Sequence, residues 1–135
     1  MNEIVLSDAL TEEMITHVVA HAPEEACGLV GGRAGRAIRL YPVENVLHSP
    51  VAYEMEPRQQ VQAMLDMEAA GEELLAIYHS HPHGPAWPSP TDRRQAYYPD
   101  TAYIIISLAD PEQPAVRAFM LQDGLATEIA VGRCS

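Results

Sequence analysis

Residues 74–92 read LLAIYHSHPHGPAWPSPTD, and this stretch decides the fold more than any other part of the chain. The run Leu74–Tyr78 is continuously apolar, which is typical of a central strand buried on both faces. The stretch from Pro82 to Pro90 contains four prolines and a glycine, so a stiff loop should follow the strand. A short helix is then expected from about Pro90 to Tyr97.

The N-terminal part of the chain predicts a helix between two strands. Ile4–Leu6 indicates a short strand, and Ser7 is suited to cap a helix over Asp8–His21. Apolar residues recur every four positions along that helix, as an amphipathic helix requires. Ala26–Val30 then indicates a buried strand, with a turn expected at Gly31–Gly32.

The remaining elements complete an α/β pattern. Pro57 is favourable at the first position of a helix that runs to about Ala70, where Gly71 ends it. Asp123-Gly124 is a strong hairpin signal. Further strands are expected at residues 37–43, 101–108, 115–121 and 125–131, with an irregular segment at 44–56. We therefore predict a single domain over residues 1–135, of the α/β class, with a mixed, largely antiparallel sheet flanked by helices.

Charge and composition exclude several classes of function. The 135 residues include 19 acidic and 8 basic side chains, for a net charge of −11, so general affinity for nucleic acid or an anionic membrane is not expected. All eight basic residues are Arg, which excludes Schiff-base and P-loop lysine chemistry. Cys27 and Cys134 are too few for a disulfide framework or a four-thiolate metal site. With no basic leader and no apolar run of about 20 residues, we expect a soluble, cytoplasmic protein.

Two histidines at the end of the buried strand form the first candidate ligand pair. His79 and His81 are two residues apart, and side chains at that spacing on a strand point to the same face. Two neutral imidazoles placed in this way can hold one Zn²⁺ ion, although two surface histidines in a polar loop would show the same spacing. Asp92 adds a carboxylate in the first turn of the expected short helix. Two histidines and one carboxylate, with a fourth position for water, are typical of a catalytic zinc site.

Three further residues in this stretch each allow two interpretations. Ser89 fits a helix N-cap three residues before Asp92, but its hydroxyl could instead donate to an oxyanion beside a metal, and the two roles compete for the same side chain. His83 is expected to be solvated or to support a metal ligand, because it lies beyond Pro82. Trp87 either closes the loop onto the core or contacts a substrate.

A zinc hydrolase also needs a general base that takes a proton from water and passes it to the leaving group. Glu24 and Glu25 lead into the buried strand at 26–30, and a glutamate at the rim of a central strand could supply this base. Two adjacent acids at such a place more often form a solvated strand end. Spacing alone does not distinguish the two.

In combination, these motifs resemble the JAMM (MPN+) zinc metalloprotease family. Glu-x-x-Gly-Leu at residues 25–29 precedes His-Ser-His-Pro at 79–82 and Ser-x-x-Asp at 89–92, in the family's order and spacing. The likeness covers most of the chain and is closest to the compact prokaryotic branch, which is similar to peptidases that act on ubiquitin-like sulfur-carrier proteins. It implies a mixed sheet between helices, related to the cytidine deaminases.

Carried over position by position, the resemblance implies that His79, His81 and Asp92 hold one Zn²⁺ per chain. Glu25, which stands three residues before the motif's glycine, would be the general base. Ser89 would stabilise the tetrahedral oxyanion. The implied reaction is hydrolysis of an amide or isopeptide bond, with no covalent acyl-enzyme.

The implied partner is a ubiquitin-like or sulfur-carrier protein with an extended C-terminal tail of the Gly-Gly type. The tail would pair with an edge formed by residues 44–56. There is little sequence between Leu108 and Ala115, so the long insertion of eukaryotic lysine-63-linkage deubiquitinases looks absent.

Three other classes of protein share part of these motifs. A non-catalytic MPN-like scaffold would generally have lost ligands, whereas this chain keeps all of them. A RadC-like protein, of obscure activity, has a similar His-x-His-Pro and Ser-x-x-Asp motif, but it usually carries a helical DNA-binding region ahead of the motif, which we do not expect here. A zinc nucleobase deaminase needs Pro-Cys-x-x-Cys, which this sequence lacks.

Overall fold

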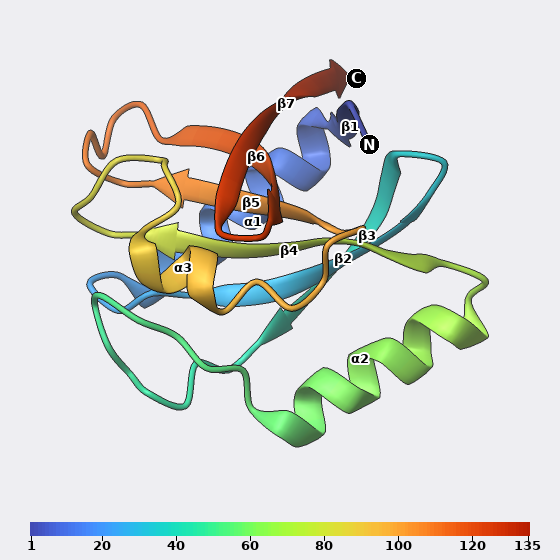
Figure 1. Cartoon of the computed structure of the whole chain (residues 1–135), viewed down its shortest axis with the longest axis horizontal. Helices are drawn as coiled ribbons and strands as arrows, with labels where there is room; N and C mark the ends of the chain where they lie inside the picture. The colour runs from blue at the N-terminus through green and yellow to red at the C-terminus, as the bar shows by residue number, and fades with distance from the viewer.

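The computed structural model describes all 135 residues and contains seven strands and three helices (Figure 1). The elements in chain order are β1 (Glu3–Ser7), α1 (Asp8–His21), β2 (Cys27–Arg33), β3 (Arg36–Val43), α2 (Pro57–Ala69), β4 (Glu73–His81), α3 (Pro90–Arg94), β5 (Ala102–Ser107), β6 (Ala115–Gln122) and β7 (Leu125–Cys134). None of the helices is long and apolar enough to cross a membrane. The predicted α/β class is confirmed.

The seven strands form one closed sheet in the order β1-β3-β2-β4-β5-β6-β7, because β1 also pairs with β7. The pairs β2–β3, β2–β4, β5–β6 and β6–β7 are antiparallel, and the pairs β1–β3, β1–β7 and β4–β5 are parallel. The mixed, largely antiparallel sheet is thus confirmed. Its closure was not predicted, because it depends on a pairing between the two ends of the chain, which lie close together in Figure 1.

Local signals fix several boundaries where the sequence placed them. Ser7 caps α1, since its Oγ accepts a hydrogen bond from the N–H of Leu10 at 3.1 Å. Gly71 follows α2 with a φ of 70°, a left-handed conformation that favours glycine. Asp123 and Gly124 both have positive φ, which matches the twist of the hairpin between β6 and β7.

The prediction of a turn at Gly31 and Gly32 is wrong. Both glycines lie inside β2, and the turn follows at residues 34–35. The register with β3 shifts between Gly31 and Gly32, and a Cβ atom on Gly32 would collide with the carbonyl oxygen of Arg36. The glycines therefore allow a bulge and a close backbone approach rather than a turn.

The short helix α3 ends at Arg94 rather than near Tyr97. The segment that follows leaves the helical path, and there the N–H of Tyr98 donates to the hydroxyl of Tyr103 at 3.2 Å. The first turn of α3 is nevertheless present where it was expected, and this turn carries Asp92.

Alternating side chains of the central strands pack into two apolar layers. In β5, Ile104 and Ile106 belong to the layer that includes residues of α1, whereas Ile105 belongs to the layer that includes residues of α2. In β4, Ile77 belongs to the α2 layer as well. His79 and His81 follow at steps of two residues and therefore face the same side.

Candidate metal centre

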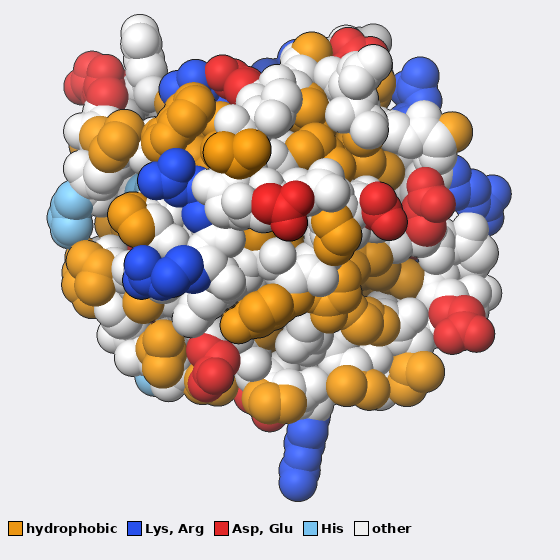
Figure 2. All heavy atoms as spheres, in the orientation of Figure 1, with side chains coloured by type: hydrophobic (Ala, Val, Ile, Leu, Met, Phe, Trp, Pro, Cys, Tyr) orange, Lys and Arg blue, Asp and Glu red, His pale blue; other side chains and the backbone are white.

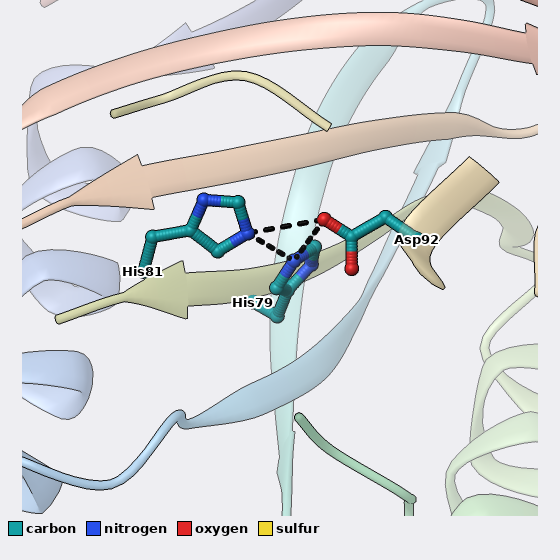
Figure 3. A group of neighbouring side chains, drawn as sticks. All are labelled: His79, His81 and Asp92. Carbon is teal, nitrogen blue, oxygen red and sulfur yellow. Dashed lines mark hydrogen bonds and ion pairs between the residues drawn. The ribbon is translucent and has the colours of Figure 1, made fainter. Parts of the chain in front are cut away.

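Three side chains from the end of β4 and the start of α3 point toward one another (Figure 3). The Nε2 atoms of His79 and His81 are 3.1 Å apart. They lie 3.2 and 3.0 Å, respectively, from Oδ2 of Asp92. The structure therefore brings together the three predicted ligands, and no fourth His, Cys, Asp or Glu belongs to this group.

The donor set fits a zinc ion. Zn²⁺ binds nitrogen and carboxylate oxygen at about 2.0–2.2 Å, which sets tetrahedral ligands roughly 3.3–3.6 Å apart, close to the three separations observed. Nδ1 of His81 lies 2.8 Å from the carbonyl oxygen of Pro85. A carbonyl only accepts, so Nδ1 of His81 carries a proton, and in the neutral ring Nε2 is the atom whose lone pair would be available to a metal ion. Lone pairs and an anionic oxygen that converge in this way favour a cation between them.

The three side chains also change one another's protonation. Burial by itself raises the pKa of Asp92, but the hydrogen bonds from His79 and His81 outweigh it and hold that pKa well below its usual range. Burial by itself lowers the pKa of His81, yet its hydrogen bonds to Asp92 and Pro85 leave that pKa above the usual value. Asp92 is therefore ionised near neutral pH and able to serve as a ligand.

Hydrogen bonds from the end of β5 hold the loop that joins the ligands. The N–H of Leu108 donates to the carbonyl oxygen of His81 at 3.1 Å. The hydroxyl of Ser107 donates to the carbonyl oxygen of Gly84 at 2.6 Å. The proline-rich loop predicted from the sequence is thus fixed at its start to the neighbouring strand.

Ser89 is the N-cap of α3. Its Oγ accepts from the N–H of Asp92 at 3.0 Å, and its own N–H donates to Oδ2 of Asp92 at 2.9 Å, which completes a capping box. The cap uses only an oxygen lone pair, so the hydroxyl proton stays free for another acceptor. The cap role is thus present, and it uses a different part of the hydroxyl from the one an oxyanion would need.

Glu25 lies in a buried position near the ligand group. Cys27 of β2 is opposite His79 of β4, and two further steps along both chains bring Glu25 toward His81. Glu25 is only 5% exposed, and Oε1 of its side chain has no hydrogen-bond partner. Burial raises the pKa of Glu25 to about 8; the charge of His81 opposes this shift and that of Asp92 adds to it. A carboxyl group with a pKa near neutrality is suited to take up and release a proton.

The other residues considered from the sequence are placed differently. Glu24 pairs with His48, whose Nδ1 lies 3.1 Å from Oε1 of Glu24. His83 is exposed and does not belong to the ligand group. Trp87 packs edge-on against Phe119, with 5.0 Å between ring centres, and stays 41% exposed. The loop thus contacts the core through Trp87, while part of the indole remains accessible.

Two residues that support the site were missed by the sequence reasoning. Ser80, between the histidines, accepts a hydrogen bond from the N–H of Ala26 at 2.9 Å. This bond fastens the residues just before β2 to strand β4. Tyr53 stacks on His79, with ring centres 4.6 Å apart. Strand alternation could have pointed to Ser80, which faces away from the histidines. No local pattern in residues 44–56 points to Tyr53.

Two hollows lie in this region; the first includes Tyr53, which stacks on His79, and the second includes His81 itself. The first, of about 310 Å³, lies between residues 44–56 and the chain around α3, and its aromatic walls are Tyr53, Tyr97, Tyr98 and Tyr103. Hydrophobic side chains continue from it toward α2 (Figure 2), where Met64 and Met67 line a neighbouring hollow. The second, of about 340 Å³, is bounded by the proline-rich loop together with Glu25, His81 and Ser89.

The chain is similar to a known family and to several known proteins. A family model described as prokaryotic homologs of the JAB domain matches residues 7–122. The chain is 35% identical over 127 residues to the CysO-cysteine peptidase of Mycobacterium tuberculosis. The matched stretch covers 93% of this chain and 87% of that protein. It is 40% identical over 123 residues to the probable TtuB-protein conjugate cleaving protease of Thermus thermophilus, and this match covers 90% of this chain and 78% of that protein. The solution structure of a protein from Desulfitobacterium hafniense superposes with a TM-score of 0.89 at 38% identity, over 98% of this chain and 93% of that one.

Proposed function

The chain belongs to the prokaryotic homologs of the JAB domain, and on this premise we propose that it is a zinc-dependent peptidase. It hydrolyses an amide or isopeptide bond after the Gly-Gly type tail of a ubiquitin-like or sulfur-carrier protein. The names of the relatives that cleave CysO-cysteine and TtuB conjugates support this substrate class. The observation that carries the proposal is the convergence of three ligand atoms near the buried, unpartnered carboxyl oxygen of Glu25.

His79, His81 and Asp92 are the residues that would hold the zinc ion, one per chain. When bound, zinc supplies Lewis-acid chemistry, since it lowers the pKa of a water toward about 7 and polarises the scissile carbonyl. The hydrogen bond from Nδ1 of His81 to the carbonyl of Pro85 fixes the imidazole ring and leaves Nε2 for the metal. The N–H of Ser89 aims the carboxylate of Asp92 in the same way.

Glu25 acts first as a general base and then as a general acid. Its carboxylate takes a proton from the attacking water as the water oxygen bonds to the carbonyl carbon. When the C–N bond breaks, Glu25 returns that proton to the departing amine, so the products are a carrier with a free carboxyl group and an amine. Burial raises the pKa of the metal-free Glu25 side chain, which makes its carboxylate a stronger proton acceptor than an exposed one. A zinc ion held nearby would favour the ionised form that accepts the proton. The hydroxyl of Ser89 donates to the carbonyl oxygen as negative charge develops there.

The position of the proton donor sets the direction in which the substrate lies. Glu25 and Ser89 border the hollow formed by the proline-rich loop, so the departing amine occupies that hollow. The tail of the carrier then enters from the other side, through the hollow walled by tyrosines between residues 44–56 and α3.

The proposal is tested with small carrier proteins that end in Gly-Gly. Each carries either a cysteine in α-amide linkage or a lysine side chain in isopeptide linkage, and carriers that end in Leu-Leu serve as matched controls. The zinc-loaded protein should release a carrier with a free C-terminal glycine from at least one Gly-Gly conjugate, as seen by intact mass. Removal of zinc with a chelator should stop the release, and zinc should restore it. If every Gly-Gly conjugate stayed intact, or if cleavage continued without metal, the proposed function would be wrong.

A further inference from the structure

Both peptide groups of Glu25 are bonded to residues 44–56 rather than to a neighbouring strand. The N–H of Glu25 donates to the carbonyl oxygen of Ser49 at 2.8 Å. The carbonyl oxygen of Glu25 accepts from the side-chain Nδ2 of Asn45 at 2.9 Å. The backbone of the proposed general base is therefore held by the segment that lies next to the tyrosine-walled hollow.

Asn45 uses its entire hydrogen-bonding capacity at this point. Besides the bond to Glu25, its Nδ2 donates to the carbonyl oxygen of Ala52 at 3.1 Å. Its Oδ1 accepts from the N–H groups of Leu47 at 3.0 Å and Glu54 at 3.1 Å. An asparagine amide offers two donors and two acceptor lone pairs, so all four are satisfied in a residue that is only 7% exposed. A buried and complete network of this kind holds its members rigidly.

The same segment also reaches the metal ligands. Its two arms are joined by backbone hydrogen bonds from Val46 to Glu54 and from Glu56 to Glu44, each at 2.9 Å. Tyr53, which directly precedes Glu54 in this segment, stacks on the ring of His79. Movement of residues 44–56 would therefore displace both a wall of the hollow and the backbone of Glu25.

We propose that Asn45 is a positioning residue that couples the tail-binding segment to Glu25, so that a seated tail fixes the general base in its working position. This inference rests on the proposed function, in which the tail lies along residues 44–56 and Glu25 moves the proton. Asn45 touches neither substrate nor metal and acts only through the carbonyl of Glu25 and the bonds it makes within residues 44–56.

The test compares Asn45→Ala with a matched control that loosens the same segment elsewhere. Oε1 of Gln59 accepts from the N–H of Glu44 at 2.7 Å, so Gln59→Ala removes an anchor of the segment that does not touch Glu25. Asn45→Asp is a second variant of nearly unchanged size, which keeps an acceptor for Leu47 and Glu54 and loses both donors. Zinc content and melting temperature are measured for every variant.

Cleavage kinetics give the first readout. Asn45→Ala and Asn45→Asp should lower kcat by about 10- to 100-fold, because small misplacements of a catalytic group are costly, whereas Gln59→Ala should mainly raise KM. In a Glu25→Gln background, Asn45→Ala should cause little further loss of kcat, because two residues that act through one group are not additive. Equal kcat in the Asn45 variants and wild type, or a full additional loss in the Glu25→Gln background, would overturn the coupling.

Amide hydrogen exchange gives a readout that needs no catalysis. Exchange at the N–H of Glu25 should be faster in the Asn45 variants and unchanged in Gln59→Ala. In the wild-type protein, a peptide that ends in Gly-Gly should slow exchange at Glu25 as well as within residues 45–54. Protection confined to 45–54 would contradict the coupling even if the Asn45 variants failed to fold. Absence of cleavage and of any protection by the peptide would count against the proposed function itself.

Discussion

Ser89 and Asp92 hold each other in place while Asp92 faces both histidines. The N–H of Asp92 donates to Oγ of Ser89 at 3.0 Å, and the N–H of Ser89 donates to Oδ2 of Asp92 at 2.9 Å. The same Oδ2 lies within 3.2 Å of both histidine nitrogens. A five-residue helix would not be stable alone, so its capped first turn serves to aim a ligand rather than to build the core.

The first prediction separates the two roles of Ser89. Ser89→Ala should lower the melting temperature, because it removes a helix cap that contributes about 1 kcal/mol to the free energy of unfolding. It should also lower kcat by about 10²–10³-fold, because the hydroxyl donor to the oxyanion is lost. Ser89→Thr, which keeps both functions of the hydroxyl, is the control, and zinc content is measured throughout. Near-normal kcat in a folded Ser89→Ala variant would show that Ser89 acts only as a helix cap and does not stabilise the oxyanion.

The second prediction concerns the metal. The purified protein should contain about one Zn²⁺ per chain by elemental analysis, and His79→Ala, His81→Ala and Asp92→Ala should each lose most of it, since a three-ligand site has little redundancy. His83→Ala, in the same loop but exposed, should keep its zinc. Cys27→Ser and Cys134→Ser should keep it too; zinc loss in either would point to a thiolate ligand.

The third prediction concerns Gly28, the glycine three residues after Glu25. A Cβ atom on Gly28 would lie 2.5 Å from ring atoms of Tyr78, which is fully buried. Gly28→Ala should therefore destabilise the protein by about 1–3 kcal/mol through overpacking, measured by denaturant unfolding. Gly84→Ala is the control, because its nearest heavy atom would be 3.9 Å away. Unchanged stability in Gly28→Ala would show that the tyrosine ring can shift at little cost.

The fourth prediction concerns pH in the zinc-stripped protein. Burial raises the pKa of Glu25 from 4.5 to about 8, so the folded protein binds this proton more tightly than the unfolded chain does. The resulting stability is complete below about pH 4.5 and is lost as the pH rises through 8, at no more than about 1.4 kcal/mol per pH unit. The difference in unfolding free energy between wild type and Glu25→Gln should therefore fall across this window. A difference that stays constant with pH would contradict the raised pKa.

Much of the site could be predicted because its signals are local. The two-residue step between His79 and His81 and the cap pattern around Ser89 are properties of one strand and one helical turn. Their joint spacing to Asp92 also carries the family resemblance. The same local logic placed the bounds of α1 and the hairpin at Asp123-Gly124 correctly.

What the sequence did not predict depends on contacts between distant segments. The pairing of β1 with β7 closes the sheet, and the role of Gly32 follows from the approach of the Arg36 backbone. The bonds of Asn45 and the stacking of Tyr53 arise in a segment without regular periodicity. Such contacts come from tertiary packing and leave no pattern in the neighbouring residues.

The most direct test of the proposed chemistry compares Glu25→Gln with Glu24→Gln at matched zinc content. Glu25→Gln keeps the size of the side chain but cannot accept a proton, whereas the Glu24 side chain pairs with His48. The measurement is the rate at which a Gly-Gly-tailed carrier is released from its conjugate. Glu25→Gln should hold normal zinc and lose at least about 10²–10⁴-fold in turnover, with Glu24→Gln close to wild type. A Glu25→Gln variant that cleaves at the wild-type rate would contradict the assignment of Glu25 as the general base.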